Sequence, residues 1–194
     1  FILGESVFKF EEEFARYCGV DYAVSTSSGT SALHFSLLAL GVKRGDYVIT
    51  TPASFVATAN VALHVNAVPV FADIDIGTYN VNPELLEKKV TGKTRAVIPV
   101  HLYGFPADMN SILEISRVHG IAVVEDACQA HGAEYYGRKA GSIGDVGCFS
   151  FYSTKNMTVC GDGGMVVTDD EKIAKIVAKL RDCGRDSHLS LIHI

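Results

Sequence analysis

The chain has 194 residues, of which 48% are hydrophobic and 20% charged, and its formal net charge is −5. These values are ordinary for a folded domain that buries a core of its own. Basic residues form no extended run and no apolar stretch reaches transmembrane length, so we expect neither nucleic acid nor a membrane as a partner.

Helix and strand patterns alternate through the first half of the chain. Val7, Phe10, Phe14 and Tyr17 recur at helical spacing, and Gly19 ends this helix. The sequence then predicts a strand at Tyr22–Thr26, a helix that starts near Thr30 and ends at Ala39, a strand at Tyr47–Thr50, a helix from Pro52 to about Val65 and a strand at Val68–Ala72.

The second half continues the alternation. It predicts a helix at Pro83–Val90, a strand at Arg95–Val100, a helix from Pro106 to about His119, strands at Ile121–Glu125, Gly147–Phe151 and Met165–Thr168, and a last helix that ends at Arg181. Residues 134–144 are rich in glycine and tyrosine and indicate an irregular loop or hairpin.

Strands that are apolar on both faces and alternate with helices are typical of a mostly parallel sheet covered on both sides. We therefore expect a three-layer α/β/α fold. Ligands of such sheets lie beyond the carboxyl ends of the strands. Asp126, Ser150 and the segment 27–30 all fall at or just beyond strand ends, and this shared placement predicts a site at that edge.

The cysteines and the chain ends bear on environment and domain organisation. The 5 cysteines are widely spaced and lack a C-x-x-C pair, which predicts no disulfide framework, no bound metal and a cytoplasmic environment. The chain starts at Phe1, and its last residues, 189–194, resemble the translation of a DNA-library adapter. We interpret them as an artefact rather than a natural apolar tail. We expect residues 1–188 to be part of the large domain of a longer protein.

Ser28, Gly29 and Thr30 stand between a strand and a helix. Backbone N–H groups at a helix N-terminus bind phosphate, and glycine allows a close approach. Serine and threonine also favour this position as ordinary helix caps, so this motif leaves both interpretations open. Ser150 could donate its hydroxyl to the same phosphate or satisfy a backbone group.

Asp126 follows an apolar run and could simply cap the next helix. A carboxylate at this position could also hold the ring nitrogen of pyridoxal phosphate (PLP) protonated, which improves the ring as an electron sink. Gln129 lies one helical turn further along the chain and could reach the ring hydroxyl of the same cofactor.

Lys155 follows an aromatic strand and precedes a glycine-rich turn. A lysine amine can condense with the aldehyde of PLP, although an isolated loop lysine is more often simply solvated. Phe55 could stack on the cofactor ring, although a lone aromatic residue more often belongs to the core. The combination of an amine, an acid and a phosphate-binding helix start is what favours PLP.

These segments together resemble the DegT/DnrJ/EryC1/StrS family of sugar aminotransferases, which are fold-type I PLP enzymes. The resemblance runs from about Gly4 to Gly184 and rests on four motifs in the family order. They are Ser27-Ser28-Gly29-Thr30-Ser31-Ala32-Leu33-His34, Pro99-Val100-His101-Leu102-Tyr103-Gly104, Glu125-Asp126-Ala127-Cys128-Gln129-Ala130-His131-Gly132 and Phe149-Ser150-Phe151-Tyr152-Ser153-Thr154-Lys155-Asn156.

The resemblance implies specific roles for the residues of these motifs. Lys155 would hold PLP covalently, Asp126 would pair with the ring nitrogen, and Gln129 would lie near the ring hydroxyl. The other implied cofactor contacts are Ser28, Gly29, Thr30 and Ser150 at the phosphate and Phe55 over the ring. Family members that dehydrate sugars carry histidine at the lysine position, so Lys155 favours transamination.

The resemblance also implies the reactants and the assembly. Glutamate or glutamine would donate the amino group, and a keto-sugar linked to a nucleotide would accept it, in amino-sugar biosynthesis for a polysaccharide, cell-surface glycan or antibiotic. Family members are homodimers whose sites borrow residues from the partner, and they carry a smaller C-terminal domain. We expect little activity from this chain alone.

Three alternatives remain beside the aminotransferase. A PLP-dependent sugar dehydratase or lyase would use the same site, and a non-catalytic PLP-binding regulator would bind the cofactor without turnover. A nucleotide-binding Rossmann module is disfavoured because no G-x-G-x-x-G follows the first strand.

Overall fold

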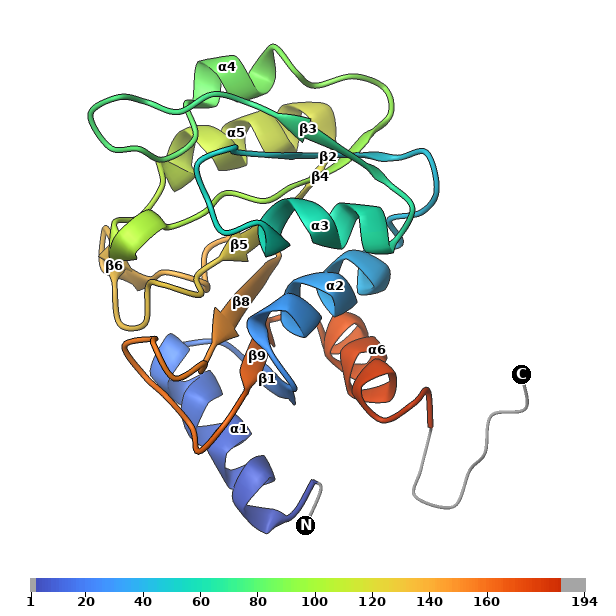
Figure 1. Ribbon diagram of the computed structural model, residues 1–194, viewed down its shortest axis with the longest axis vertical. Coiled ribbons are helices and arrows are strands. Elements are labelled where there is room, and N and C mark those ends of the chain that lie inside the picture. Colours follow the sequence, from blue (N-terminus) through green and yellow to red (C-terminus); the bar gives the residue numbers. More distant parts are fainter. Residues whose placement is uncertain (1–2, 186–194) are drawn as a thin grey trace.

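A seven-stranded sheet with helices on both sides forms the centre of the computed structural model, which describes residues 3–185 (Figure 1). Its strands are β1 (Tyr22–Thr26), β2 (Tyr47–Thr50), β3 (Val68–Phe71), β4 (Thr94–Val97), β5 (Ala122–Asp126), β8 (Val146–Ser150) and β9 (Gly164–Thr168). They lie in the order β1-β9-β8-β5-β4-β2-β3, so strands distant in the sequence become neighbours.

Most neighbouring strands are parallel, as expected. The strands β3, β2, β4, β5 and β8 form a continuous parallel ladder, while β9 runs antiparallel to both β8 and β1. Because β9 reverses direction between them, β1 and β8 point the same way. The carboxyl ends of β1, β2, β5 and β8 therefore lie at one edge of the sheet.

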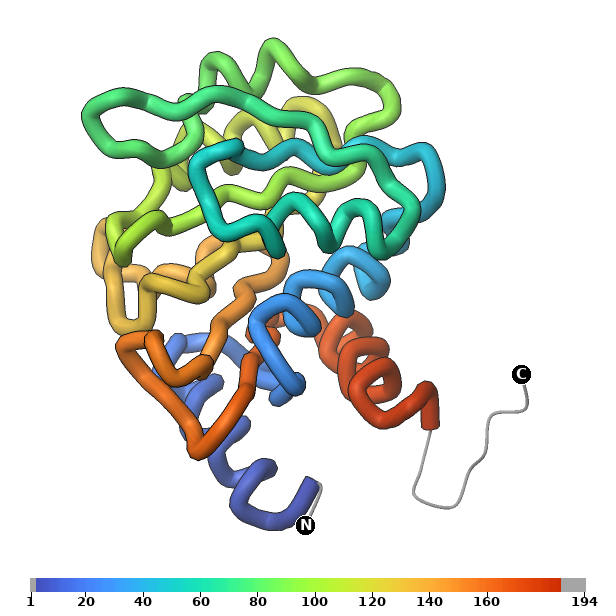
Figure 2. Tube along the Cα trace, viewed as in Figure 1, coloured from blue at the N-terminus to red at the C-terminus, as the bar shows by residue number. Residues whose placement is uncertain are grey.

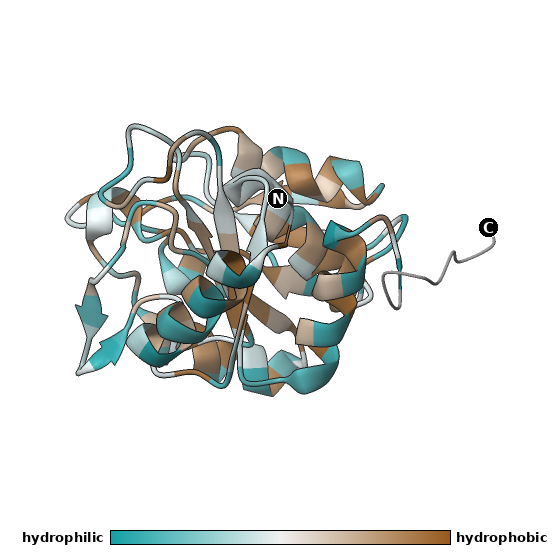
Figure 3. Cartoon of the chain, turned by 90° about the horizontal axis from the view of Figure 1, so that it is seen from below, coloured by the Kyte–Doolittle hydropathy of each residue, from teal (hydrophilic) through white to brown (hydrophobic). Residues whose placement is uncertain are grey.

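Helices cover both faces of the sheet and complete the predicted three layers. They are α1 (Glu5–Cys18), α2 (Gly29–Ala39), α3 (Ala57–His64), α4 (Pro83–Glu87), α5 (Met109–His119) and α6 (Glu171–Arg181), with a short 3-10 helix η1 at Leu102–Gly104. Figure 3 shows apolar residues concentrated between the helices and the sheet.

Alternate strand residues divide between the two faces. On β5, Val124 packs in the cluster formed with α2, α3 and α6, while Val123 packs in the cluster formed with α4 and α5. A third cluster joins α1 to β8 and β9, and there Phe10 and Phe14 contact Phe151. Figure 2 accordingly shows the N-terminal helix beside the segment that joins β8 to β9. Burial of both strand faces explains the continuous apolar runs.

Two predicted helix starts were wrong. The helix predicted from Pro52 begins at Ala57, because the Thr51 side chain accepts the Ala53 N–H at 3.1 Å and holds residues 52–56 as a loop. The helix predicted from Pro106 begins at Met109, where the Asp108 carboxylate accepts the Ser111 N–H and acts as N-cap. In both cases local side-chain hydrogen bonds outweigh the preference of proline for a first helical turn.

Several smaller features complete the description. Residues 134–144 contain the hairpin of β6 (Glu134–Tyr135) and β7 (Arg138–Lys139), and all five cysteines are free. Within residues 3–185, none of the helices combines the length and the apolar character that crossing a membrane requires. The segment 189–194, interpreted as an artefact, lies outside the described residues.

Candidate active site

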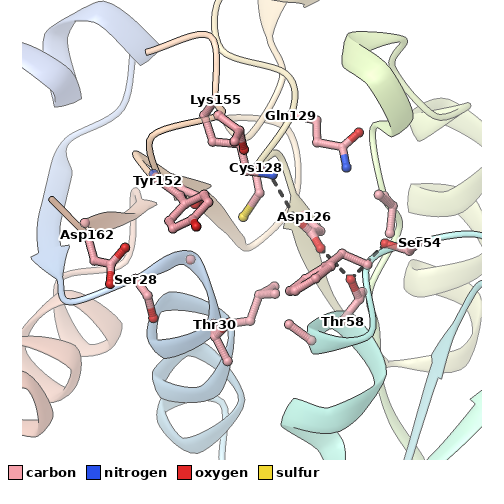
Figure 4. A pocket seen from close by; sticks show the side chains of 18 residues that line it. Ser28, Thr30, Ser54, Thr58, Asp126, Cys128, Gln129, Tyr152, Lys155 and Asp162 are labelled. Atoms are coloured by element: carbon pink, nitrogen blue, oxygen red, sulfur yellow. Dashed lines mark hydrogen bonds between the residues drawn. The ribbon is translucent and has the colours of Figure 1, made fainter. Parts of the chain in front are cut away.

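A cavity of ≈ 380 Å³ opens at the carboxyl edge of the sheet (Figure 4). The structure brings all eight residues singled out in the sequence to its lining: Ser28, Gly29, Thr30, Phe55, Asp126, Gln129, Ser150 and Lys155. They come from segments that follow β1, β2, β5 and β8, which are the strands whose carboxyl ends meet at this edge.

The N-terminus of α2 faces the cavity with donors available. Ser28 is the N-cap, and its hydroxyl accepts the Ser31 N–H at 3.1 Å. Among the described residues, none accepts a hydrogen bond from the N–H groups of Gly29 and Thr30. Free N–H groups in the first turn, together with the helix dipole, form a site suited to an anion such as phosphate.

Glycine is required where α2 meets the sheet. A Cβ at Gly29 would lie 2.8 Å from Ser150 Cβ and 2.7 Å from Cys128 Sγ. A Cβ at Gly164 would lie 2.3 Å from the Ser28 carbonyl oxygen. The start of α2 therefore touches the ends of β8 and β9, and this contact brings the Ser150 side chain next to the helix N-terminus.

Asp126 ends β5 and is held on both carboxylate oxygens. It is 6% exposed, and its Oδ2 accepts a hydrogen bond from Thr58 Oγ1 at 2.7 Å. Its Oδ1 accepts the Cys128 N–H at 3.2 Å. The Cys128 contact caps a turn, because in the described part of the chain no helix follows β5 directly. The Thr58 contact comes from a different element and leaves the carboxylate turned toward the cavity (Figure 4).

Lys155 lies half-buried in the loop between β8 and β9. Its backbone N–H closes a turn by donating to the Tyr152 carbonyl at 2.8 Å. Within the described part of the chain, its amine has no salt bridge or side-chain hydrogen bond. An amine at the lining of a cavity without a protein partner is available to a ligand.

Gln129 and Phe55 both line the cavity. Gln129 Oε1 accepts the Tyr103 N–H at 2.9 Å, which fixes the amide orientation and leaves its NH₂ group as the donor for a ligand. Phe55 is 67% exposed at the cavity, so the interpretation as a core residue was wrong.

Glu125, the residue before Asp126, anchors β5 through the hydrogen bonds of its carboxylate. Glu125 is fully buried, and its carboxylate accepts a hydrogen bond from His101 Nε2 at 2.8 Å. It also accepts the N–H groups of Gly141, Ile143 and Gly144. Burial favours the protonated form of Glu125, but these hydrogen bonds outweigh it and lower its pKa below the ordinary value of 4.5.

Sequence reasoning missed several residues of the lining. Thr58 contacts Asp126, and Ser54 contacts Thr58. Cys128, Tyr152 and Asp162 also line the cavity. Cys128 is no nucleophile, because burial and the charge of Asp126 raise the pKa of its thiol well above the ordinary value. The only signal for Ser54 and Thr58 was their spacing of four residues, which also occurs in any helix.

The fold and the position of the cavity define an α/β domain that carries a ligand site at the carboxyl edge of its sheet. Residues 1–191 match the sequence profile of the DegT/DnrJ/EryC1/StrS aminotransferase family. The chain belongs to this family.

Relatives with known names include sugar-modifying enzymes. The chain is 52% identical to an uncharacterised protein of Methanocaldococcus jannaschii, over 92% of this chain and 46% of that protein. It is 44% identical to GDP-perosamine synthase of Caulobacter vibrioides, over 95% of this chain and 49% of the relative. The chain thus spans about half the length of the relatives that it matches.

Solved structures share the fold closely. The structure of S. venezuelae DesV in complex with a ketimine intermediate matches with a TM-score of 0.94 and 43% identity, over 97% of this chain and 51% of that chain. GDP-4-keto-6-deoxymannose-3-dehydratase with a trapped PLP-glutamate geminal diamine matches with a TM-score of 0.90 and 34% identity, over 96% of this chain and 50% of that chain.

Proposed function

We propose that this chain is the PLP-binding part of an aminotransferase that acts on a nucleotide-linked keto-sugar. The observation that carries the proposal is the convergence of Lys155, Asp126 and the N-terminus of α2 on one cavity. An amine, a carboxylate and an anion site at one sheet edge match the aldehyde, the ring nitrogen and the phosphate of PLP.

The residues present fit this cofactor. Gly29 and Thr30 offer free backbone N–H groups, and the Ser150 hydroxyl lies next to them through the close packing at Gly29. A side chain at Gly29 would push the helix start away from β8. Asp126 supplies the acceptor for a protonated ring nitrogen, and the amide NH₂ of Gln129 supplies a donor for the ring oxygen.

When bound, PLP supplies an electron-withdrawing ring that stabilises negative charge at the Cα of an amino donor. The Asp126 carboxylate would keep the ring nitrogen protonated and thereby strengthen this withdrawal. Lys155 would hold PLP through its amine and, once the donor amine has replaced it, would serve as the general base for the proton on the donor Cα. The same amine would serve the acceptor in the reverse direction.

The substrate class and the donor are inferred from the relatives. GDP-perosamine synthase is named for an amino sugar linked to a nucleotide, and the matched dehydratase structure contains glutamate with PLP. These names support a keto-sugar nucleotide as acceptor and glutamate or glutamine as donor. They also support a role in amino-sugar biosynthesis for a polysaccharide, cell-surface glycan or antibiotic.

The proposed enzyme is longer than this chain and acts as a cytoplasmic homodimer. Residues 1–188 would form its large domain, and a smaller C-terminal domain and the partner subunit would complete the substrate site. The coverage of about half of each relative supports this organisation. Little turnover is expected from the chain on its own.

The first test of this function is cofactor binding by the full-length protein. We expect added PLP to give the absorbance band of a lysine-bound cofactor, and Lys155→Ala to abolish it. Lys172→Ala, which changes an exposed lysine on α6 outside the cavity, serves as the matched control and should leave the band unchanged. A band that survives in Lys155→Ala would refute the assignment of Lys155.

A dehydratase is the second candidate, because a dehydratase structure matches this chain at 34% identity. The full-length protein, incubated with glutamate and a keto-sugar nucleotide, should form 2-oxoglutarate and an amino sugar in equal amounts. Loss of a sugar hydroxyl without an amino sugar as product would identify a dehydratase. Binding of PLP without any product would identify a regulator.

A further inference from the structure

Thr58 lines the proposed cofactor site next to Asp126. It lies in the first turn of α3, is 1% exposed, and donates from Oγ1 to Asp126 Oδ2 at 2.7 Å. Its Oγ1 also lies 2.9 Å from Ser54 Oγ, in the loop that carries Phe55 (Figure 4). Thr58 thus connects two elements that meet only in the folded protein.

The donor and the acceptor in each of these two hydrogen bonds can be assigned, because a hydroxyl group has a single proton. Thr58 has one hydroxyl proton, and that proton is used in the bond to Asp126. In the contact between Ser54 and Thr58, therefore, the Ser54 hydroxyl must be the donor. The result is a short chain of donors that runs from Ser54 through Thr58 to the carboxylate.

The carboxylate of Asp126 is fixed in orientation by this chain. Thr58 holds Oδ2, and the backbone N–H of Cys128 holds Oδ1, so rotation of the carboxylate would break one bond or the other. A hydrogen bond from a ring nitrogen to a carboxylate depends on the direction of the acceptor lone pairs. Fixing the carboxylate before the ligand binds lowers the cost of binding.

The Thr58 hydroxyl does not donate its proton to the backbone of its own helix. A helical serine or threonine commonly satisfies its hydroxyl by bonding to a carbonyl of the preceding turn, as Ser36 does with Ala32 at 2.8 Å. Thr58 instead uses its only proton on a side chain 68 positions away in the sequence. The cap position of α3 is Val56, which offers no side-chain hydrogen bond.

We propose that Thr58 is a positioning residue that fixes the Asp126 carboxylate for the ring nitrogen of PLP, and that Ser54 couples this contact to the Phe55 loop. The inference rests on the proposed function, because it assigns Asp126 to the cofactor ring. Ser54 and Thr58 both line the cavity, and the role assigned to them here is exercised through the Asp126 carboxylate.

The test compares matched variants of the full-length protein in PLP binding. Thr58→Val removes the hydroxyl and nearly keeps the shape, while Thr58→Ser keeps the donor. Thr50→Val is the control, because Thr50 is also 1% exposed and donates to the Ile98 carbonyl at 2.9 Å. We expect Thr58→Val to weaken PLP affinity about tenfold, Ser54→Ala about threefold, and Thr58→Ser and Thr50→Val by less than about twofold.

A second readout reports on the ring nitrogen itself. With PLP labelled with ¹⁵N in the ring, the wild-type chemical shift should be that of a protonated nitrogen bound to a carboxylate. Thr58→Val should move this shift, whereas Thr58→Ser and Thr50→Val should preserve it. A merely structural role of Thr58 would lower the melting temperature and leave the chemical shift in place.

The outcomes separate this inference from the function on which it rests. Wild-type affinity together with an unchanged ¹⁵N shift in Thr58→Val would overturn the positioning role and leave the aminotransferase intact. Equal losses of affinity in Thr58→Val and Thr50→Val would overturn it as well. A wild-type protein that does not bind PLP would overturn both proposals together.

Discussion

The two residues with the central proposed roles have opposite surroundings. Asp126 is buried and hydrogen-bonded on both oxygens, whereas Lys155 is half-buried on a loop and has no polar side-chain partner among residues 3–185. An acid that only holds a ring nitrogen gains from a fixed position. An amine that both carries a cofactor and moves a proton between two carbons needs freedom, and the loop provides it.

Replacing Asp126 by asparagine tests the role of the charge at the residue scale. The amide nearly keeps the shape of the carboxylate, so Asp126→Asn should still bind PLP through Lys155 and the start of α2. The neutral side chain cannot hold the ring nitrogen protonated, so we expect turnover to fall at least about a hundredfold. The assay is 2-oxoglutarate formation by the full-length protein. Unchanged turnover would show that Asp126 only caps the turn that contains Cys128.

At the scale of elements, the site depends on how closely α2 approaches β8. Gly29→Ala would place a Cβ 2.8 Å from Ser150 Cβ, so the helix start must shift, and overpacking of this kind costs about 1–3 kcal/mol. We expect a lower melting temperature and PLP affinity weakened by about tenfold or more. The measurements are thermal unfolding of the apoprotein and titration with PLP.

Gly92→Ala is the matched control for this prediction. A Cβ added at Gly92 would meet no atom within 4 Å, and this residue lies outside the cavity. The substitution should therefore leave PLP affinity unchanged. If Gly29→Ala also bound PLP with wild-type affinity, the start of α2 would not be the phosphate site.

The sequence predicted the strands better than the helix starts, for a physical reason. β1 and β2 occupy the predicted residues, because buried strands need continuous apolar runs that are visible in one dimension. The starts of α3 and α5 depend on hydrogen bonds from Thr51 and Asp108 that compete with the proline signal. Such competition is decided by local geometry and not by residue type.

The site residues likewise divide into those that the sequence could predict and those that it could not. Residues at strand ends, such as Asp126 and Ser150, could be assigned to one sheet edge because the carboxyl ends of parallel strands lie together. Thr58 could not be assigned, since its contact with Asp126 depends on the packing of α3 against the end of β5. Contacts of that kind between distant segments leave no pattern in a single sequence.

At the scale of the whole molecule, two partly buried histidines make stability depend on pH. Burial lowers the pKa of His34 below the ordinary value of 6.5, and the charge of His64 lowers it further. Burial also lowers the pKa of His131; a backbone contact with Ser150 opposes this effect and the charge of Lys155 adds to it. The unfolded chain therefore binds these protons more readily than the folded one. Stability should be complete above about pH 6.5 and should fall as the pH decreases below it.

A variant at His131 tests this pH dependence. The His131 ring is partly buried and packs on Phe149 and Phe151. His131→Leu should reduce the slope of unfolding free energy between pH 7 and pH 5, by up to about 1.4 kcal/mol per pH unit for one proton. Urea unfolding at several pH values measures the slope.

Val118→Ala provides the control for this measurement. Val118 is exposed on α5 and has no titratable group, so its replacement should leave the slope between pH 7 and pH 5 close to that of the wild type. An equal slope in wild type and His131→Leu would show that His131 is not the group that titrates.

The pairing of β8 with β9 determines which part of the site can change in sequence without a change of fold. Ser150 and Gly164 are opposite each other in the ladder, so both ends of the segment that carries Lys155 are fixed at one point of the sheet. The entropy of closing this loop is set by the ladder and changes only slowly with loop length. Insertions and substitutions between these two anchors can therefore alter the surroundings of the amine while the sheet and the start of α2 stay in place. Phe151 belongs to the core and Lys155 carries the proposed chemistry, so the exposed positions 152–154 and 156–162 are those at which new specificities can arise without a new fold.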